Sequence, residues 1–155
     1  MNRISWNSLL STGNPELDVD HGMLVRLFNR LADAMNDHKG KAFCCNGLNK
    51  IIQITKVHFD LEQELMARHG YPYVEKHTTE HAMLMRQLVN WKAKFEAGTA
   101  RNFSGMIQIP EEWLTRHIVT SDRELAEFIS SRSGSNEQMR KSRGSKPGNS
   151  ELSRK

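Results

Sequence analysis

The stretch HFDLEQELM, which spans residues 58–66, places a histidine and a glutamate among apolar residues on what is expected to be the buried side of a helix. His58 and Glu62 stand four residues apart, so on a helix their side chains share one face. Leu61, Leu65 and Met66 around them indicate that this face is buried. Because a buried, unpaired imidazole or carboxylate is strongly destabilising, the pair is expected to be hydrogen-bonded or bound to metal.

The surrounding sequence predicts an all-α protein. Apolar residues recur at helical spacing from Pro15 to Ile129, and strand-like alternation is nowhere sustained. Helix-breaking residues separate four helical segments, at about 15–38, 43–68, 73–96 and from Pro110 to about 129. Connections are short except for residues 97–109. This pattern predicts an antiparallel up-down-up-down four-helix bundle.

Both ends of the chain differ from this bundle. Residues 1–14 predict an N-terminal arm, which Trp6, Leu9 and Leu10 are expected to pin to a helix surface. Residues 131–155 are nearly devoid of apolar side chains and predict a disordered basic tail. Without the net +5 of this tail, the net charge falls from +4 to −1. The predicted domains are therefore an arm (1–14), a bundle (15–130) and a tail (131–155). The tail is either a solvated end or a weak contact for an acidic partner, a membrane surface or nucleic acid.

The sequence also predicts a location. No segment approaches the roughly 18 apolar residues of a membrane span, and the N-terminus lacks the apolar run of a signal peptide. We therefore expect a cytoplasmic protein. The adjacent Cys44 and Cys45 fit a reducing compartment, either as ordinary helix-start residues or as redox-sensitive thiols.

Each of the four predicted inner faces contains histidine, and two also contain a carboxylate. The residues are His21, His58, Glu62, His77, His81, His117 and Asp122. Antiparallel packing would bring all of them to one end of the bundle. His117 and Asp122 are five residues apart, about 140° around an α-helix, so they are expected to flank one metal position.

Five nitrogen and two carboxylate donors suit two six-coordinate ions bridged by the carboxylates, about 3.5–4 Å apart. Imidazole-rich ligation without thiolates favours iron, zinc or copper over magnesium or calcium.

Four motifs give these residues a family resemblance. They are GNPELDVDH (13–21), HFDLEQELM (58–66) followed by GYP, HTTEH (77–81) and WLTRHIVTSD (113–122). Over about residues 6–130 the sequence resembles the hemerythrins, and among them the single-domain bacteriohemerythrins.

The resemblance implies two iron ions with an oxo or hydroxo bridge and dioxygen as the ligand. One iron would be bound by His77, His81 and His117 and the other by His21 and His58, with Glu62 and Asp122 bridging them. The iron with two histidines would keep an open position for dioxygen. Leu114 and Trp113 fall where the family lines its dioxygen pocket.

Two positions depart from the family pattern. Asp20 replaces a common glutamine before the first ligand histidine, and Gly22 replaces a common basic residue after it. Asp20 is expected to alter the charge near the open iron. Glycine inside a helix costs about 1 kcal/mol, so Gly22 is expected to loosen the first helix beside His21.

The expected function is reversible dioxygen binding for storage, delivery to an oxygen-consuming enzyme, or scavenging, rather than enzymatic catalysis. Two alternatives stay open: an oxygen or redox sensor that signals to a partner through the tail, and a di-iron oxidase or peroxidase. The inner faces offer no further polar residue as a general acid or base, which favours a carrier. No nucleic-acid partner is expected.

Overall fold

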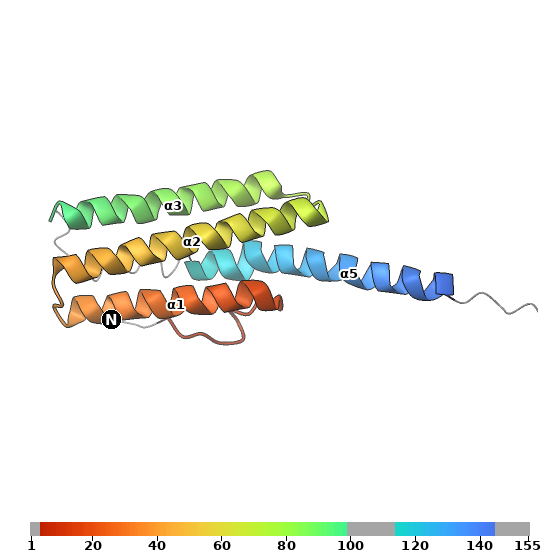
Figure 1. Ribbon diagram of the computed structural model, residues 1–155, viewed down its shortest axis with the longest axis horizontal. Coiled ribbons are helices and arrows are strands. Elements are labelled where there is room, and N and C mark those ends of the chain that lie inside the picture. Colours follow the sequence, from red (N-terminus) through yellow and green to blue (C-terminus); the bar gives the residue numbers. More distant parts are fainter. Residues whose placement is uncertain (1–3, 99–113, 145–155) are drawn as a thin grey trace, which may run out of the picture.

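The computed structural model describes residues 4–98 and 114–144. Within these ranges the chain forms no strand, and its helices are α1 (Pro15–Asn36), α2 (Lys41–His69), α3 (Val74–Glu96), the π-helical η1 (Ile118–Asp122) and α5 (Arg123–Gly144). Residues 114–117 form a helical turn directly before η1. The chain direction alternates from α1 to α2, α3 and α5 (Figure 1). The predicted all-α, up-down-up-down bundle is confirmed.

Local sequence signals account for the helix ends. The Asn14 side chain caps α1 by accepting hydrogen bonds from the backbone N–H groups of Glu16 and Leu17, at 3.0 and 3.4 Å. Gly70 ends α2 with a left-handed φ of 64°, a conformation that favours glycine. The predicted start of the fourth helix after Pro110 lies outside the described residues.

The core consists of two apolar clusters with a polar layer between them. The larger cluster includes Leu24, Leu48 and Leu88, and the smaller one includes Leu17 and Leu125. Along α1, α2 and the fourth helical segment, the predicted histidines and carboxylates fall between residues of the two clusters, and on the third they follow Tyr71 of the smaller cluster and precede Leu88 of the larger one. The apolar clusters therefore hold the four helices in the register that brings these polar residues to one level. Cys44 and Cys45, near the start of α2, are free thiols.

The N-terminal arm packs against the bundle through only part of the predicted apolar residues, and through Ile4 in addition. Ile4 and Leu10 are buried, at 8% and 5% exposure, whereas Trp6 and Leu9 are 40% and 70% exposed. The prediction is thus right for Leu10 and wrong for Leu9, while the partly exposed Trp6 does contact α1, with its ring centroid 6.5 Å from that of His21. The reason is a turn in which the backbone N–H of Leu10 donates to the carbonyl of Asn7, which turns Leu10 inward and leaves Leu9 outside.

A carboxylate on α1 holds the end of the arm. Asp18 accepts hydrogen bonds from the Ser11 hydroxyl (2.6 Å), from the Thr12 hydroxyl (2.8 Å) and from the Thr12 and Gly13 backbone N–H groups (2.7 and 3.3 Å). Arg123 donates to the carbonyl oxygens of Leu9 and Ser11, which ties the arm to α5 as well. Burial raises the pKa of Asp18, but the hydrogen bonds outweigh it and the pKa lies below 3.8.

Replacing Asp18 by alanine is therefore expected to detach the arm and to lower the unfolding free energy by about 1–2 kcal/mol, as hydrogen bonds to a charged group are lost. Hydrogen exchange of residues 4–12 and chemical denaturation measure the two effects. The stability difference from wild type should be full above pH 3.8 and disappear as the pH falls through the lower folded pKa. Asp60→Ala, at an exposed position of α2, is the control; equal exchange in both variants would contradict the assignment.

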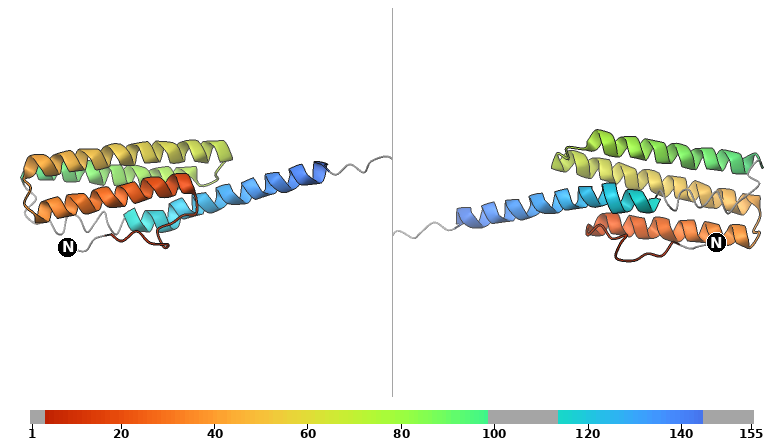
Figure 2. Two further views of the ribbon diagram at one scale, coloured as in Figure 1. Left: turned by 60° about the horizontal axis from the view of Figure 1, so that its bottom comes forward. Right: turned by 180° about the vertical axis from the view of Figure 1, so that it is seen from behind.

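Helix α5 continues past the other helices to Gly144 (Figure 2). Ile129 is the last buried residue among those whose side chains are described. Arg132 still donates a hydrogen bond to the backbone carbonyl of His69 at 2.9 Å. The division between bundle and tail at residue 130 stays a prediction, and residues 145–155 lie outside the described part.

No described helix combines the length with the apolar composition that a bilayer crossing needs.

Candidate metal centre

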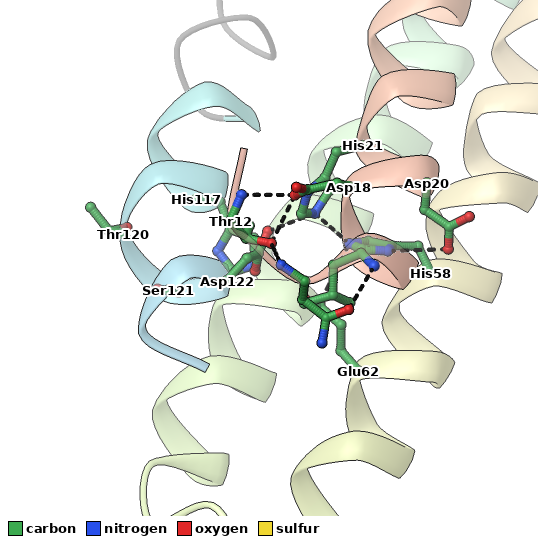
Figure 3. A network of polar contacts seen from close by, with 12 residues as sticks. Thr12, Asp18, Asp20, His21, His58, Glu62, His117, Thr120, Ser121 and Asp122 are labelled. Atoms are coloured by element: carbon green, nitrogen blue, oxygen red, sulfur yellow. Dashed lines mark hydrogen bonds and ion pairs between the residues drawn. The ribbon is translucent and has the colours of Figure 1, made fainter. Parts of the chain in front are cut away.

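The seven predicted site residues lie together in the polar layer. His21 comes from α1, His58 and Glu62 from α2, His77 and His81 from α3, and His117 and Asp122 from the segment at η1. All seven are buried, with exposures between 0% and 4%. Figure 3 shows His21, His58, Glu62, His117 and Asp122 converging on one region from separate helices. His38 and His69 belong to neither group of donors in this cluster.

The donor atoms form two groups that share both carboxylates. One group is made of Glu62, His77, His81, His117 and Asp122, and the other of His21, His58, Glu62 and Asp122. Within each group the donor atoms all lie within 4.8 Å of one another. This division into three and two histidines is the one that the family resemblance implies.

Distances between donors support two adjacent cation positions. The two oxygens of Asp122 face different groups: Oδ1 lies 3.0 Å from His117 Nε2, and Oδ2 lies 3.0 Å from His21 Nε2. The Nε2 atoms of His21 and His58 are 2.9 Å apart. Metal–nitrogen bonds of about 2.1 Å at right angles separate neighbouring donors by about 3 Å. The observed spacings therefore suit donors around shared ions.

Several of these atoms have no hydrogen-bond partner among the described residues. They include both oxygens of Glu62 and the Nε2 atoms of His77 and His81, all of which are buried. His81 Nε2 is only 2.9 Å from Glu62 Oε2, yet the two atoms do not meet in hydrogen-bond geometry. A buried polar atom without a partner costs about 1–3 kcal/mol. Bound cations would provide the missing partners, because these oxygen and nitrogen atoms lie close together without hydrogen-bonding to one another.

The π-helical turn corrects one prediction from the sequence. On an α-helix, His117 and Asp122 would lie about 140° apart. Residues 118–122 instead form the π-helix η1, whose wider turn brings residues five apart onto one side. His117 Nε2 consequently lies 3.0 Å from Asp122 Oδ1, and both side chains contribute to the same group of donors.

The pKa values of the buried carboxylates and histidines depend on one another. Burial raises the pKa of Asp122, but contacts with His117, His21 and His77 hold it well below 3.8. For His77, burial lowers the pKa, while the nearby carboxylates of Asp122 and Glu62 raise it to about 9. A cation entering the site must therefore displace protons from the histidines, which makes its affinity depend on pH.

Aromatic and apolar side chains surround the donors. The ring of Phe59 stacks on His81 with centroids 3.6 Å apart and planes 7° apart. Leu114 is buried one turn before His117. Trp113, predicted beside it, lies outside the described residues. The role of Leu114 and Trp113 in a dioxygen pocket stays a prediction.

Two further carboxylates stand behind the histidines. Asp20 Oδ2 is 3.5 Å from His58 Nδ1, which is long for a hydrogen bond. Glu80 Oε2 is 2.8 Å from His117 Nδ1 and accepts a hydrogen bond from the Ser121 hydroxyl at 2.6 Å. Glu80 was not predicted as a site residue, because its sequence position next to His81 does not reveal a contact with a different helix.

Gly22 is tested directly by substitution. A Cβ atom built at Gly22 would meet only Arg26 Nη1, at 3.6 Å, among described atoms, so Gly22→Ala is expected to stabilise the protein by about 0.5–1 kcal/mol. Denaturant unfolding measures the change. Gly47→Ala is the matched comparison, since its Cβ would press on Leu31 Cδ1 at 3.2 Å and cancel part of the gain. A destabilised Gly22→Ala protein would contradict this expectation.

Comparisons with known proteins agree with this geometry. Residues 12–129 match the family model of the hemerythrin HHE cation binding domain. The chain is 27% identical to a bacteriohemerythrin of Pseudomonas aeruginosa over 79% of its length and 78% of that protein. It is 26% identical to a bacteriohemerythrin of Ralstonia nicotianae over 83% of its length and 90% of that protein.

Similarity extends to a solved structure. Wild-type hemerythrin superposes with a TM-score of 0.75 at 23% identity, over 83% of this chain and 99% of that chain, and thus supports the fold. The family match covers the arm's end, the bundle and all seven buried donors. This chain belongs to the hemerythrin family.

Proposed function

We propose that the protein binds dioxygen reversibly at a non-haem di-iron centre, for storage, delivery or scavenging. The observation that carries the proposal is the pair of donor groups that share Glu62 and Asp122 but contain unequal numbers of histidines. His77, His81 and His117 would hold one iron, and His21 and His58 the other. The second iron is then one ligand short, as a centre that binds an exchangeable ligand requires.

When two ferrous ions are bound, they supply the two electrons needed to bind dioxygen reversibly. The chain itself positions and shields the centre. Asp122 directs its two oxygens to the two groups of donors, and η1 fixes that orientation. Phe59 covers His81 and keeps water from that side. The apolar Phe59 and Leu114 offer no group for proton transfer to a substrate, which supports a carrier and not an enzyme.

The proposal is tested by loading the purified protein with ferrous iron without oxygen and then admitting air. We expect two irons per chain and a visible absorption band that forms with dioxygen, fades under vacuum and returns. His77→Ala should lose the band. Iron that oxidises at once and irreversibly would contradict reversible binding and favour a sensor.

Replacing Leu114 by alanine is expected to shorten the lifetime of the dioxygen-dependent band at least several-fold. The reason is that Leu114 is buried one turn before His117, and its removal opens a cavity that admits water. The decay of the band in air-equilibrated buffer measures the effect. Leu88→Ala, a buried leucine of α3 in the same apolar cluster, is the control; equal decay in the two variants would refute a specific role for Leu114.

A further inference from the structure

We infer that Glu80 is a positioning residue, which holds His117 in the tautomer and orientation needed to bind the metal of the three-histidine group. The inference rests on the proposed metal centre and extends it to a residue that binds no metal itself.

The contacts of the His117 ring define its two sides. Nδ1 lies 2.8 Å from Glu80 Oε2, while Nε2 lies 3.0 Å from Asp122 Oδ1, inside the group of donors. An ionised carboxylate only accepts hydrogen bonds, so in the neutral imidazole, the form that binds a metal, Nδ1 carries the proton. This leaves the lone pair of Nε2 directed to the metal position. A carboxylate behind a ligand histidine fixes the ring and raises its basicity.

The π-helical turn connects the two sides. Ser121 donates a hydrogen bond from its hydroxyl to Glu80 Oε2 at 2.6 Å, and Asp122 is the next residue. Two consecutive residues of η1 are therefore linked to the two nitrogens of the His117 ring. Asp122 lies next to Nε2, and Ser121 is hydrogen-bonded to the Glu80 carboxylate that contacts Nδ1.

Glu80 is placed where it stays charged at little cost. Its side chain is 32% exposed and borders a surface cleft of about 210 Å³, which is also lined by Met83, Arg116, His117 and Thr120. A partly exposed pair contributes little to folding. Its effect is therefore expected on metal binding more than on stability.

The test compares Glu80→Ala, Glu80→Gln and the control Glu75→Gln, which removes the same charge from an exposed position of α3. Each full-length protein is titrated with Co²⁺ against a competing chelator, and the unfolding free energy of the metal-free form is measured alongside. Glu80→Ala should bind one of two Co²⁺ ions about 10–100-fold more weakly, with the other ion unaffected. Glu80→Gln should recover most of this loss, since its amide oxygen still accepts from Nδ1. Glu75→Gln should match wild type.

Unchanged affinity for both ions in Glu80→Ala would overturn the inference. So would an equal loss in both ions together with a large drop in metal-free stability, because that result indicates a purely structural role. A wild-type protein that binds two Co²⁺ ions, but whose iron form does not bind dioxygen, would refute the proposed function and leave the comparison for Glu80 valid. A wild-type protein that binds no Co²⁺ would overturn both.

Discussion

Removal of bound metal is expected to lower the melting temperature of this protein by about 20 °C. A ligand present at 1,000 times its dissociation constant stabilises the folded state by about 4 kcal/mol, so two ions give about 8 kcal/mol. In a chain of this size each kcal/mol shifts the melting temperature by about 2–4 °C. The buried Glu62 and Asp122 explain why the loss is large, because without cations their only counter-charges are protonated histidines.

The pH dependence of the two forms should differ in sign. In the metal-free protein the pKa of His77 is raised from 6.5 to about 9. Its stabilising contribution is thus full below pH 6.5 and lost as the pH rises through 9. In the loaded protein, cations replace these protons, and binding strengthens over the same interval. The difference in melting temperature between the two forms should therefore grow from pH 6.5 to 9.

Calorimetric scans of loaded and chelator-treated protein across this range provide the measurement. Restoring the lost temperature by adding back ferrous iron under anaerobic conditions is the control for irreversible damage. A difference of only a few degrees, constant with pH, would contradict the assignment of the buried carboxylates and histidines as metal ligands.

Replacement of Glu62 by alanine is expected to abolish binding of both metal ions, whereas His21→Ala should lose one and keep the other. Glu62 belongs to both groups of donors and His21 to only one. In addition, Glu62 Oε2 lies 2.9 Å from His81 Nε2 of one group and 3.6 Å from His58 Nε2 of the other. Loss of this carboxylate also leaves an uncompensated excess of positive charge between the two cations.

The measurement is the metal content per chain after dialysis. Circular dichroism first confirms that each variant is folded into helices. Glu64→Ala, at an exposed position of the same helix, should keep two ions. If Glu62→Ala retains one ion as His21→Ala does, Glu62 serves a single metal and the shared-carboxylate arrangement is wrong.

The sequence was sufficient to predict the helices and the set of buried donors, because both depend on periodicity. His58 and Glu62 share a helix face through their spacing of four, and their burial follows from the apolar residues around them. Antiparallel packing then determines which end of each helix meets the others. These are properties of single helices and of their order in the chain.

Other features depend on tertiary contacts. The π-helical turn at 118–122 was not predicted, and it brings His117 and Asp122 closer together than the α-helical spacing implied. Glu80 contacts His117 on another helix, and its position in HTTEH gives no indication of this. The burial of Ile4 depends on reciprocal hydrogen bonds between its backbone and the Asn29 side chain, each 2.9 Å long. Such contacts appear only when the helices are placed together.

The most direct test of the central claim is a crystal structure of the iron-loaded protein with anomalous scattering recorded at the iron absorption edge. Two iron peaks about 3.5–4 Å apart are expected between Glu62 and Asp122. One should be bound by His77, His81 and His117, and the other by His21 and His58. A single peak, or iron bound away from these seven side chains, would contradict a di-iron centre in this protein.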